Sequence, residues 1–87
     1  MKVHYRGVIA GEDWGFTVVK ESVIPFLPVP GTAISGPDSL PSPFVVTGTL
    51  WSDQEQILFV ELRQMNLPDF DREKLKQDFI EGGWSGE

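Results

Sequence analysis

The chain has 87 residues, which suits one small domain, and we expect a single domain over residues 1–87. Its 40% hydrophobic and 11% aromatic content is typical of a globular protein, and the lack of cysteine excludes a disulfide framework and fits a reducing compartment. No stretch approaches the ~18 apolar residues of a membrane-spanning helix, and charges near the N-terminus interrupt the apolar run that a signal peptide needs. We therefore expect a soluble, cytoplasmic protein with no membrane partner.

The chain is acidic, with a formal net charge of −6 from 13 acidic and 7 basic residues. Binding to phosphate groups needs clustered lysines and arginines. The basic residues that lie close together, Arg72, Lys74 and Lys76, are interleaved with the acidic residues Asp71, Glu73 and Asp78. The charge therefore predicts that nucleic acid is not the main partner. It is compatible with a basic protein partner, or simply with solubility.

Two strands are expected near the N-terminus, over residues 2–10 and 14–20, with a turn at 11–13 between them. Apolar residues alternate in both segments, as in a strand that buries one face. The side chains expected on the same face of each strand are Val3, Tyr5 and Ile9, and Trp14, Phe16 and Val18. Gly7 lies inside the first strand, where glycine marks a bulge or a close approach of another segment.

A long proline-rich loop follows over residues 21–43, which hold six of the seven prolines. Proline removes a backbone donor and fixes φ, so neither a helix nor a central strand is expected here. The apolar part, residues 23–30, is expected to pack in extended form, with Phe26 and Leu27 buried. The small, polar part, residues 31–42, is expected to be the most mobile internal segment.

The clearest pattern in the chain covers residues 44–64. Two runs of β-branched and aromatic residues flank the polar break at 52–56, which predicts a hairpin. In the second run the side chains of Leu58, Val60 and Leu62 point to one side of the strand.

Residues 69–81 are predicted to form a helix, capped by Asp69 or Asp71. Leu75 and Phe79 lie one turn apart and give the helix a narrow apolar stripe. A glycine pair follows, and glycine is favoured in the left-handed position after a helix. Because so short a helix is marginal alone in water, we expect it to dock onto the sheet.

These elements predict an α+β fold: an antiparallel sheet of two hairpins, a long proline-rich loop and one C-terminal helix. The alternative arrangement is a half-open small barrel. Gly7, Gly15 and Gly48 favour it, because they lie inside strands, where bulges would permit curvature.

Catalytic and metal-binding patterns are weak in this sequence. A catalytic histidine needs an orienting carboxylate and a nucleophile, and nothing near His4, the one histidine, supplies them in sequence. Residues 69–73 space three carboxylates like the start of a calcium loop, but Lys74 and Ile80 stand where that loop needs Gly and Glu. We therefore predict no catalytic residue, no metal ligand, no cofactor and no enzyme activity.

Two functions stay open as alternatives to the protein-interaction role that the next residues suggest. Residues 14–18 resemble the aromatic strand of nucleic-acid-binding barrels such as cold-shock domains, which would imply an OB-like barrel that binds single strands. Glu12 and Asp13 stand where such a barrel would carry basic residues. The other alternative is a small ligand-binding or enzymatic domain with its site under the loop at 21–43.

Tryptophan and acidic residues mark the candidate interface. Trp51 ends a predicted strand beside the acidic turn that holds Asp53 and Glu55, and Trp84 follows the glycine pair. Tryptophan is enriched at interface hot spots. We therefore predict a small acidic, non-catalytic protein-interaction module (an adaptor, inhibitor or assembly factor) whose candidate interface residues are Trp51, Asp53, Glu55 and Trp84.

Overall fold

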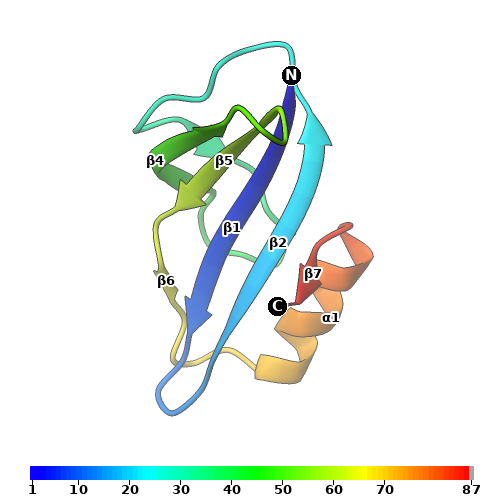
Figure 1. The fold of residues 1–87 in the computed structure, drawn as a ribbon. Helices are drawn as coiled ribbons and strands as arrows, with labels where there is room; N and C mark the ends of the chain where they lie inside the picture. Colours follow the sequence, from blue (N-terminus) through cyan, green and yellow to red (C-terminus); the bar gives the residue numbers. More distant parts are fainter. Residues whose placement is uncertain (87) are drawn as a thin grey trace.

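The computed structural model describes residues 1–86 and has an α+β fold, a curled sheet with one helix packed against it (Figure 1). Within these residues the strands are β1 (Lys2–Ala10), β2 (Gly15–Val23), β3 (Ala33–Ile34), β4 (Phe44–Ser52), β5 (Ile57–Leu62), β6 (Met65–Asn66) and β7 (Ser85–Gly86). The helix is α1 (Arg72–Glu81). The predicted fold class and the C-terminal helix are confirmed.

The strands follow the order β3-β4-β5-β1-β2-β7, and β6 pairs with the far end of β1. The two predicted hairpins, β1–β2 and β4–β5, are antiparallel. They join through a parallel pairing of β1 with β5 (Figure 1). In this pairing Val3 lies opposite Leu58. This parallel junction was not predicted, so the sheet is mixed and mostly antiparallel. A parallel pair needs a long crossover connection, and the proline-rich loop supplies much of its length.

Local backbone irregularity explains why the sheet curls into a half-barrel, the alternative arrangement considered above. The β4–β5 register shifts between Val46 and Gly48, which is a bulge, and a bulge bends the strand that carries it. A Cβ on Gly7 would lie 3.3 Å from the Phe44 ring, so this glycine allows the close approach that the sequence suggested. Gly15 lies instead in regular register opposite Ala10, without a bulge.

The core lies on the inner face of the curled sheet, under α1. Its buried side chains are Val3, Tyr5, Ile9, Val18, Phe44, Val46, Leu58, Val60, Leu62, Leu67, Leu75, Phe79 and Trp84. Trp14 and Phe16 pack against this cluster while remaining partly exposed. The alternation predicted for β1, β2 and β5 is therefore confirmed.

The helix is shorter at its start than predicted, because Asp71 caps it and α1 begins at Arg72 rather than at residue 69. The Asp71 carboxylate accepts a hydrogen bond from the Lys74 backbone N–H at 3.1 Å, which satisfies a donor of the first turn. Gly83 has φ 89°, the left-handed conformation expected after a helix. Within residues 1–86, the helix is too short and too polar to cross a bilayer.

The apolar half of the proline-rich loop differs from its prediction. Pro28 is fully buried, but Phe26 and Leu27 are exposed. The reason is tertiary: β2 continues to Val23, opposite Lys2, and Ile24 still packs against the core, so Phe26 and Leu27 lie beyond the end of the sheet. A turn closed by the Thr32 N–H and the Val29 carbonyl at 3.0 Å then directs the chain toward β4.

For residues 31–42 we expect faster amide exchange than in the β4–β5 hairpin, with the fastest exchange at 35–42. Gly31 and Thr32 exchange backbone hydrogen bonds with Val46, both at 2.9 Å, and β3 pairs with β4, whereas residues 35–42 contain no strand. Few backbone partners mean local opening at low cost. Amide hydrogen exchange followed by NMR measures this, and protection at 35–42 equal to that of the hairpin would contradict it.

Candidate functional site

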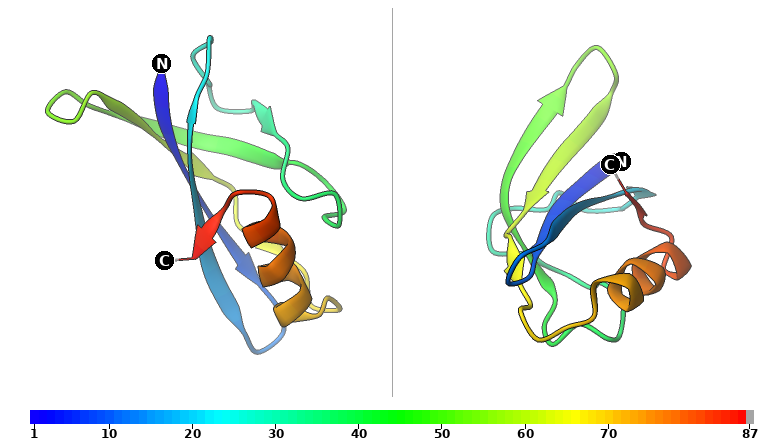
Figure 2. Two further views of the ribbon diagram at one scale, coloured as in Figure 1. Left: turned by 90° about the vertical axis from the view of Figure 1, so that its right-hand side faces the viewer. Right: turned by 90° about the horizontal axis from the view of Figure 1, so that it is seen from below.

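The β4–β5 hairpin forms an arm, which we define as residues 48–59. At its base Leu58 and Phe59 pair with Val3 and His4 of β1, and its tip extends beyond this pairing. In the left view of Figure 2 the tip of this hairpin lies far from α1 and β7. The arm begins directly after the bulge between Val46 and Gly48. Because the bulge bends β4, the strand leaves the core here and both of its faces become accessible.

Two large apolar side chains are exposed on the arm. Leu50 is 70% exposed and Trp51 is 47% exposed. They point to opposite faces because they are neighbours in a strand. Trp51 lies opposite Leu58 on the face that continues into the core, and Leu50 lies opposite Phe59 on the outer face. The end of the arm is therefore apolar on both sides.

The turn at the tip of the arm carries two exposed carboxylates, Asp53 and Glu55. Ser52 organises the turn: its carbonyl accepts from the Gln56 N–H at 2.8 Å, and its hydroxyl accepts from the Glu55 N–H at 3.3 Å. The Gln56 side-chain amide also donates to the Asp53 carbonyl at 2.6 Å. These bonds hold both acidic residues beside the apolar pair on a structured turn.

Trp84, the fourth predicted interface residue, lies in the core and is 4% exposed. Its ring centroid is 5.5 Å from that of Phe44 and 5.7 Å from that of Phe79, and Lys20 Nζ lies 5.6 Å from the ring. The left-handed Gly83 turns the chain back, and the Trp84 N–H donates to the Phe79 carbonyl at 2.9 Å. Trp84 is therefore buried in this structure, whereas Trp51, Asp53 and Glu55 lie together on the arm.

The outer face contributes residues that the sequence analysis did not single out. A row across the sheet runs from Leu50 to Phe59, then to His4 and Glu21. The His4 and Phe59 rings are 5.3 Å apart, and His4 Nδ1 is 3.8 Å from a Glu21 carboxylate oxygen. The alternation of β4 and β5 could have indicated the Leu50–Phe59 pair, but their register could not be known before the bulge was seen.

His4 also borders an open hollow together with Lys20, Glu21 and Ser85. Within the part of the chain that the structure describes, no hydrogen bond joins its imidazole to a hydroxyl group. A general base must lie within hydrogen-bond reach of the proton that it removes. The hollow brings His4 and Glu21 together beside Ser85.

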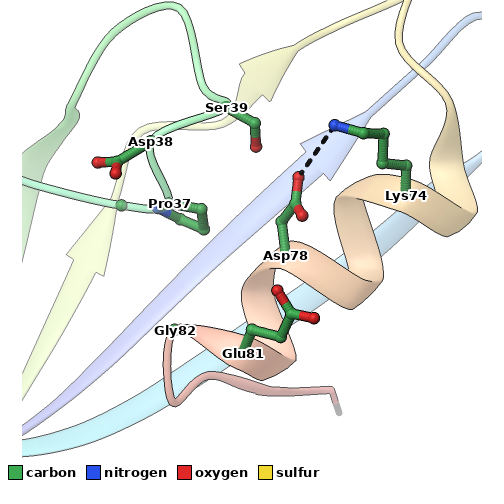
Figure 3. Close-up of a pocket in the computed structure, with 8 residues that line it drawn as sticks. Pro37, Asp38, Ser39, Lys74, Asp78, Glu81 and Gly82 are labelled. Atoms are coloured by element: carbon green, nitrogen blue, oxygen red, sulfur yellow. Dashed lines mark ion pairs between the residues drawn. The ribbon is translucent and has the colours of Figure 1, made fainter.

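A second open groove, of about 480 Å³, separates α1 from the proline-rich loop (Figure 3). Asp78, Glu81 and Lys74 line it from the helix, and Ser39 points toward the helix from the loop. Lys74 Nζ lies 3.8 Å from Asp78 Oδ2, too far for a hydrogen bond. Across residues 1–86, no three His, Cys, Asp or Glu side chains gather closely enough to hold a metal ion. The groove is polar and acidic, and it does not include His4.

The fold changes the ionisation of Tyr5, a core residue of β1. Burial raises the pKa of its phenol above the ordinary value, because the phenolate would lose its hydration in the core. The ring lies 6.4 Å from that of Trp84. Tyr5 is therefore a neutral core residue at physiological pH.

We expect the stability of the fold to decline as the pH rises above ~10, where the Tyr5 phenol of the unfolded chain ionises before that of the folded chain. Below that pH the phenol is neutral in both states and this contribution to stability is fully present. Thermal unfolding across the alkaline range should show a steeper loss for the wild type than for Tyr5→Phe. Equal slopes for the two proteins would contradict the expectation.

Three of the four predicted interface residues thus lie on the arm, and none lies in either of the two hollows described above. The arm is therefore the candidate functional site. Comparisons with protein-family models, with curated proteins and with solved structures found no match for this chain.

Proposed function

We propose that this protein is a small, non-catalytic protein-interaction module, an adaptor, inhibitor or assembly factor, that binds a basic partner protein through the arm. One observation carries the proposal: the adjacent, exposed Leu50 and Trp51 stand beside the exposed Asp53 and Glu55 on a projecting hairpin. Large exposed apolar side chains next to a polar rim are typical of a binding surface.

The two kinds of residue have different roles in this proposal. Trp51 and Leu50 supply affinity, because burying large apolar side chains at the centre of an interface provides most of the binding free energy. Asp53 and Glu55 supply charge complementarity and steer a basic partner toward the tip. The net charge of −6 favours the same partner at longer range.

The two alternative functions have less support. In the nucleic-acid-binding barrel, the aromatic residues of β2 would stack on bases. Here the Phe16 ring makes an edge contact with Phe79 of α1, with centroids 6.1 Å apart, and it stacks on Trp14 at 5.8 Å. In the ligand-binding alternative, the groove under the loop would hold the site, and it holds carboxylates and Lys74 without a histidine.

The partner can be captured from the native host, identified by mass spectrometry and titrated by calorimetry. We expect Trp51→Ala to weaken binding by at least about tenfold, as for a hot-spot residue. A double substitution, Asp53→Asn with Glu55→Gln, should weaken binding by a smaller factor and reduce its salt dependence. Both variants should have melting temperatures close to that of the wild type, because all three side chains are exposed.

Val23→Ala is the matched control, since Val23 is 77% exposed and lies on β2, outside the arm. It should bind the partner like the wild type. Unchanged affinity for Trp51→Ala would contradict the proposed function. Fluorescence anisotropy with short single- and double-stranded oligonucleotides tests the main alternative, and a micromolar or tighter affinity at physiological salt would favour the nucleic-acid-binding barrel instead.

A further inference from the structure

The outer edge of β4 is paired along only the first part of the strand. β3 lies opposite Phe44 and Val45, and Val46 exchanges hydrogen bonds with the backbone of Gly31 and Thr32. From residue 47 to residue 52, no strand within residues 1–86 pairs with this edge. The other side of β4 is occupied by β5 over the same stretch.

The free edge presents unpaired backbone groups along the arm. In an antiparallel pair, the N–H and C=O groups of successive residues point alternately toward the partner strand and away from it. About half of the backbone groups of residues 48–52 therefore point outward. Such a row is a template for one more strand.

Apart from the bulge between Val46 and Gly48, which lies just before it, this edge carries none of the usual features that prevent strand addition. Edges are commonly protected by lysine, proline, an inward-pointing charge or a covering segment. Residues 48–52 contain no charge and no proline. The edge of β2 differs, because β7 covers Val18 and Val19, and Lys20 and Glu21 follow directly.

We propose that the edge of β4 over residues 48–52 binds an extended segment of the partner protein as an added antiparallel strand. Apolar side chains of that segment lie against Leu50 on one face and against Trp51 on the other. In the antiparallel direction the N-terminal end of the segment lies beside the acidic turn, so lysine or arginine there meets Asp53 and Glu55. The inference rests on the proposed function and specifies the kind of partner.

Charge decides between a foreign segment and a second copy of this chain. Two copies would each bring a net charge of −6, which opposes their association. A basic segment complements the turn at the tip. The binding mode has a known physical basis, because main-chain hydrogen bonds supply affinity and alternate side chains supply specificity in strand addition.

The test uses a short synthetic peptide with two arginines followed by a run of valines, which places apolar side chains on both faces of the added strand, and amide hydrogen exchange of the ¹⁵N-labelled protein. In the free protein, alternate amides of residues 48–52 should exchange readily. With saturating peptide, the exchange of these amides should slow by at least about tenfold. The amides of the β2 edge at 20–23 serve as the internal control and should not change.

Two control peptides separate backbone pairing from side-chain contact. A central proline removes a ladder donor and should abolish binding. Glutamates in place of the arginines should weaken binding by about tenfold. Slowed exchange with the arginine peptide, together with loss of binding for the proline peptide, supports strand addition. Binding of the proline peptide with equal affinity would overturn it, because contact would then involve side chains only.

Two further outcomes would also overturn the inference. One is that no peptide slows the outward amides. The other is protection that rises with protein concentration in the absence of peptide, since a second copy would then occupy the edge. In either case, weaker binding of the natural partner to the Trp51→Ala protein would still support the proposed function. Unchanged affinity of that variant is what contradicts the function itself.

Discussion

Phe79→Ala is expected to lower the free energy of unfolding by about 3–5 kcal/mol, the usual cost of truncating a buried aromatic side chain. Phe79 is 2% exposed, and its ring lies about 6 Å, between centroids, from those of Phe16, Phe44 and Trp84. It thus connects α1 to β2, to β4 and to the segment after the helix. Removing the ring leaves a cavity at the point where these elements meet.

The loss should be large relative to the stability of the whole domain, which is typically about 5–15 kcal/mol. The helix has 10 residues, and a helix of that length depends on docking for its stability. Thermal unfolding measures the effect. Ile80→Ala is the control, because Ile80 is the next residue on the same helix but is 60% exposed, and it should change the free energy by less than about 0.5 kcal/mol.

A melting-temperature shift below about 2 °C for Phe79→Ala would be too small for such a core loss in a domain of this size. It would mean that α1 is not docked onto the sheet in solution. The C-terminal segment would then become the stronger candidate for a binding element, in place of the arm.

Trp84→Ala is expected to have a similar effect, a loss of about 3–5 kcal/mol in the free energy of unfolding. The indole packs against Phe44 and Phe79, and Lys20 Nζ lies over it, so the substitution removes contacts to two strands and the helix. Denaturant unfolding at equilibrium measures the loss as a lower midpoint with an unchanged slope.

Trp51→Ala is the matched control for Trp84→Ala, because both substitutions remove one tryptophan and differ mainly in burial. We expect less than about 1 kcal/mol of destabilisation for the exposed Trp51. Iodide should quench the fluorescence of the Trp84→Ala protein more strongly than that of Trp51→Ala. If the Trp84→Ala protein kept its full stability and bound the partner more weakly, Trp84 would be assigned to the interface rather than to the core.

Local patterns predicted most of the individual elements. The period of two in β1 and β5 depends on strand geometry alone, so Val3, Tyr5 and the alternating residues of β5 were placed on the core face from sequence. The Asp71 cap and the glycine after α1 are equally local, because a helix end needs a side-chain acceptor at its start and a left-handed residue after it. The helix boundary was wrong by one turn because two aspartates stood as possible caps.

The sequence also indicated part of the candidate site. A polar break between two strands places its residues at the tip of a hairpin, so the exposure of Asp53 and Glu55 follows from local geometry. Trp51 was selected because tryptophan is common at interfaces, and that argument selected Trp84 equally. Composition cannot separate the two, since both a core and an interface favour a large aromatic side chain.

The sequence by itself thus determined the four longer strands, their two hairpins, the helix stripe and the acidic turn, because each depends on residues within a few positions of one another. Only the tertiary structure decided the parallel pairing of β1 with β5, the burial of Trp84 and the exposure of Phe26. It also decided that β4 extends past the residues that pair with β3, which leaves its edge free beside Leu50 and Trp51. These features depend on contacts between distant segments, whose register a local period of two or 3.6 residues does not specify.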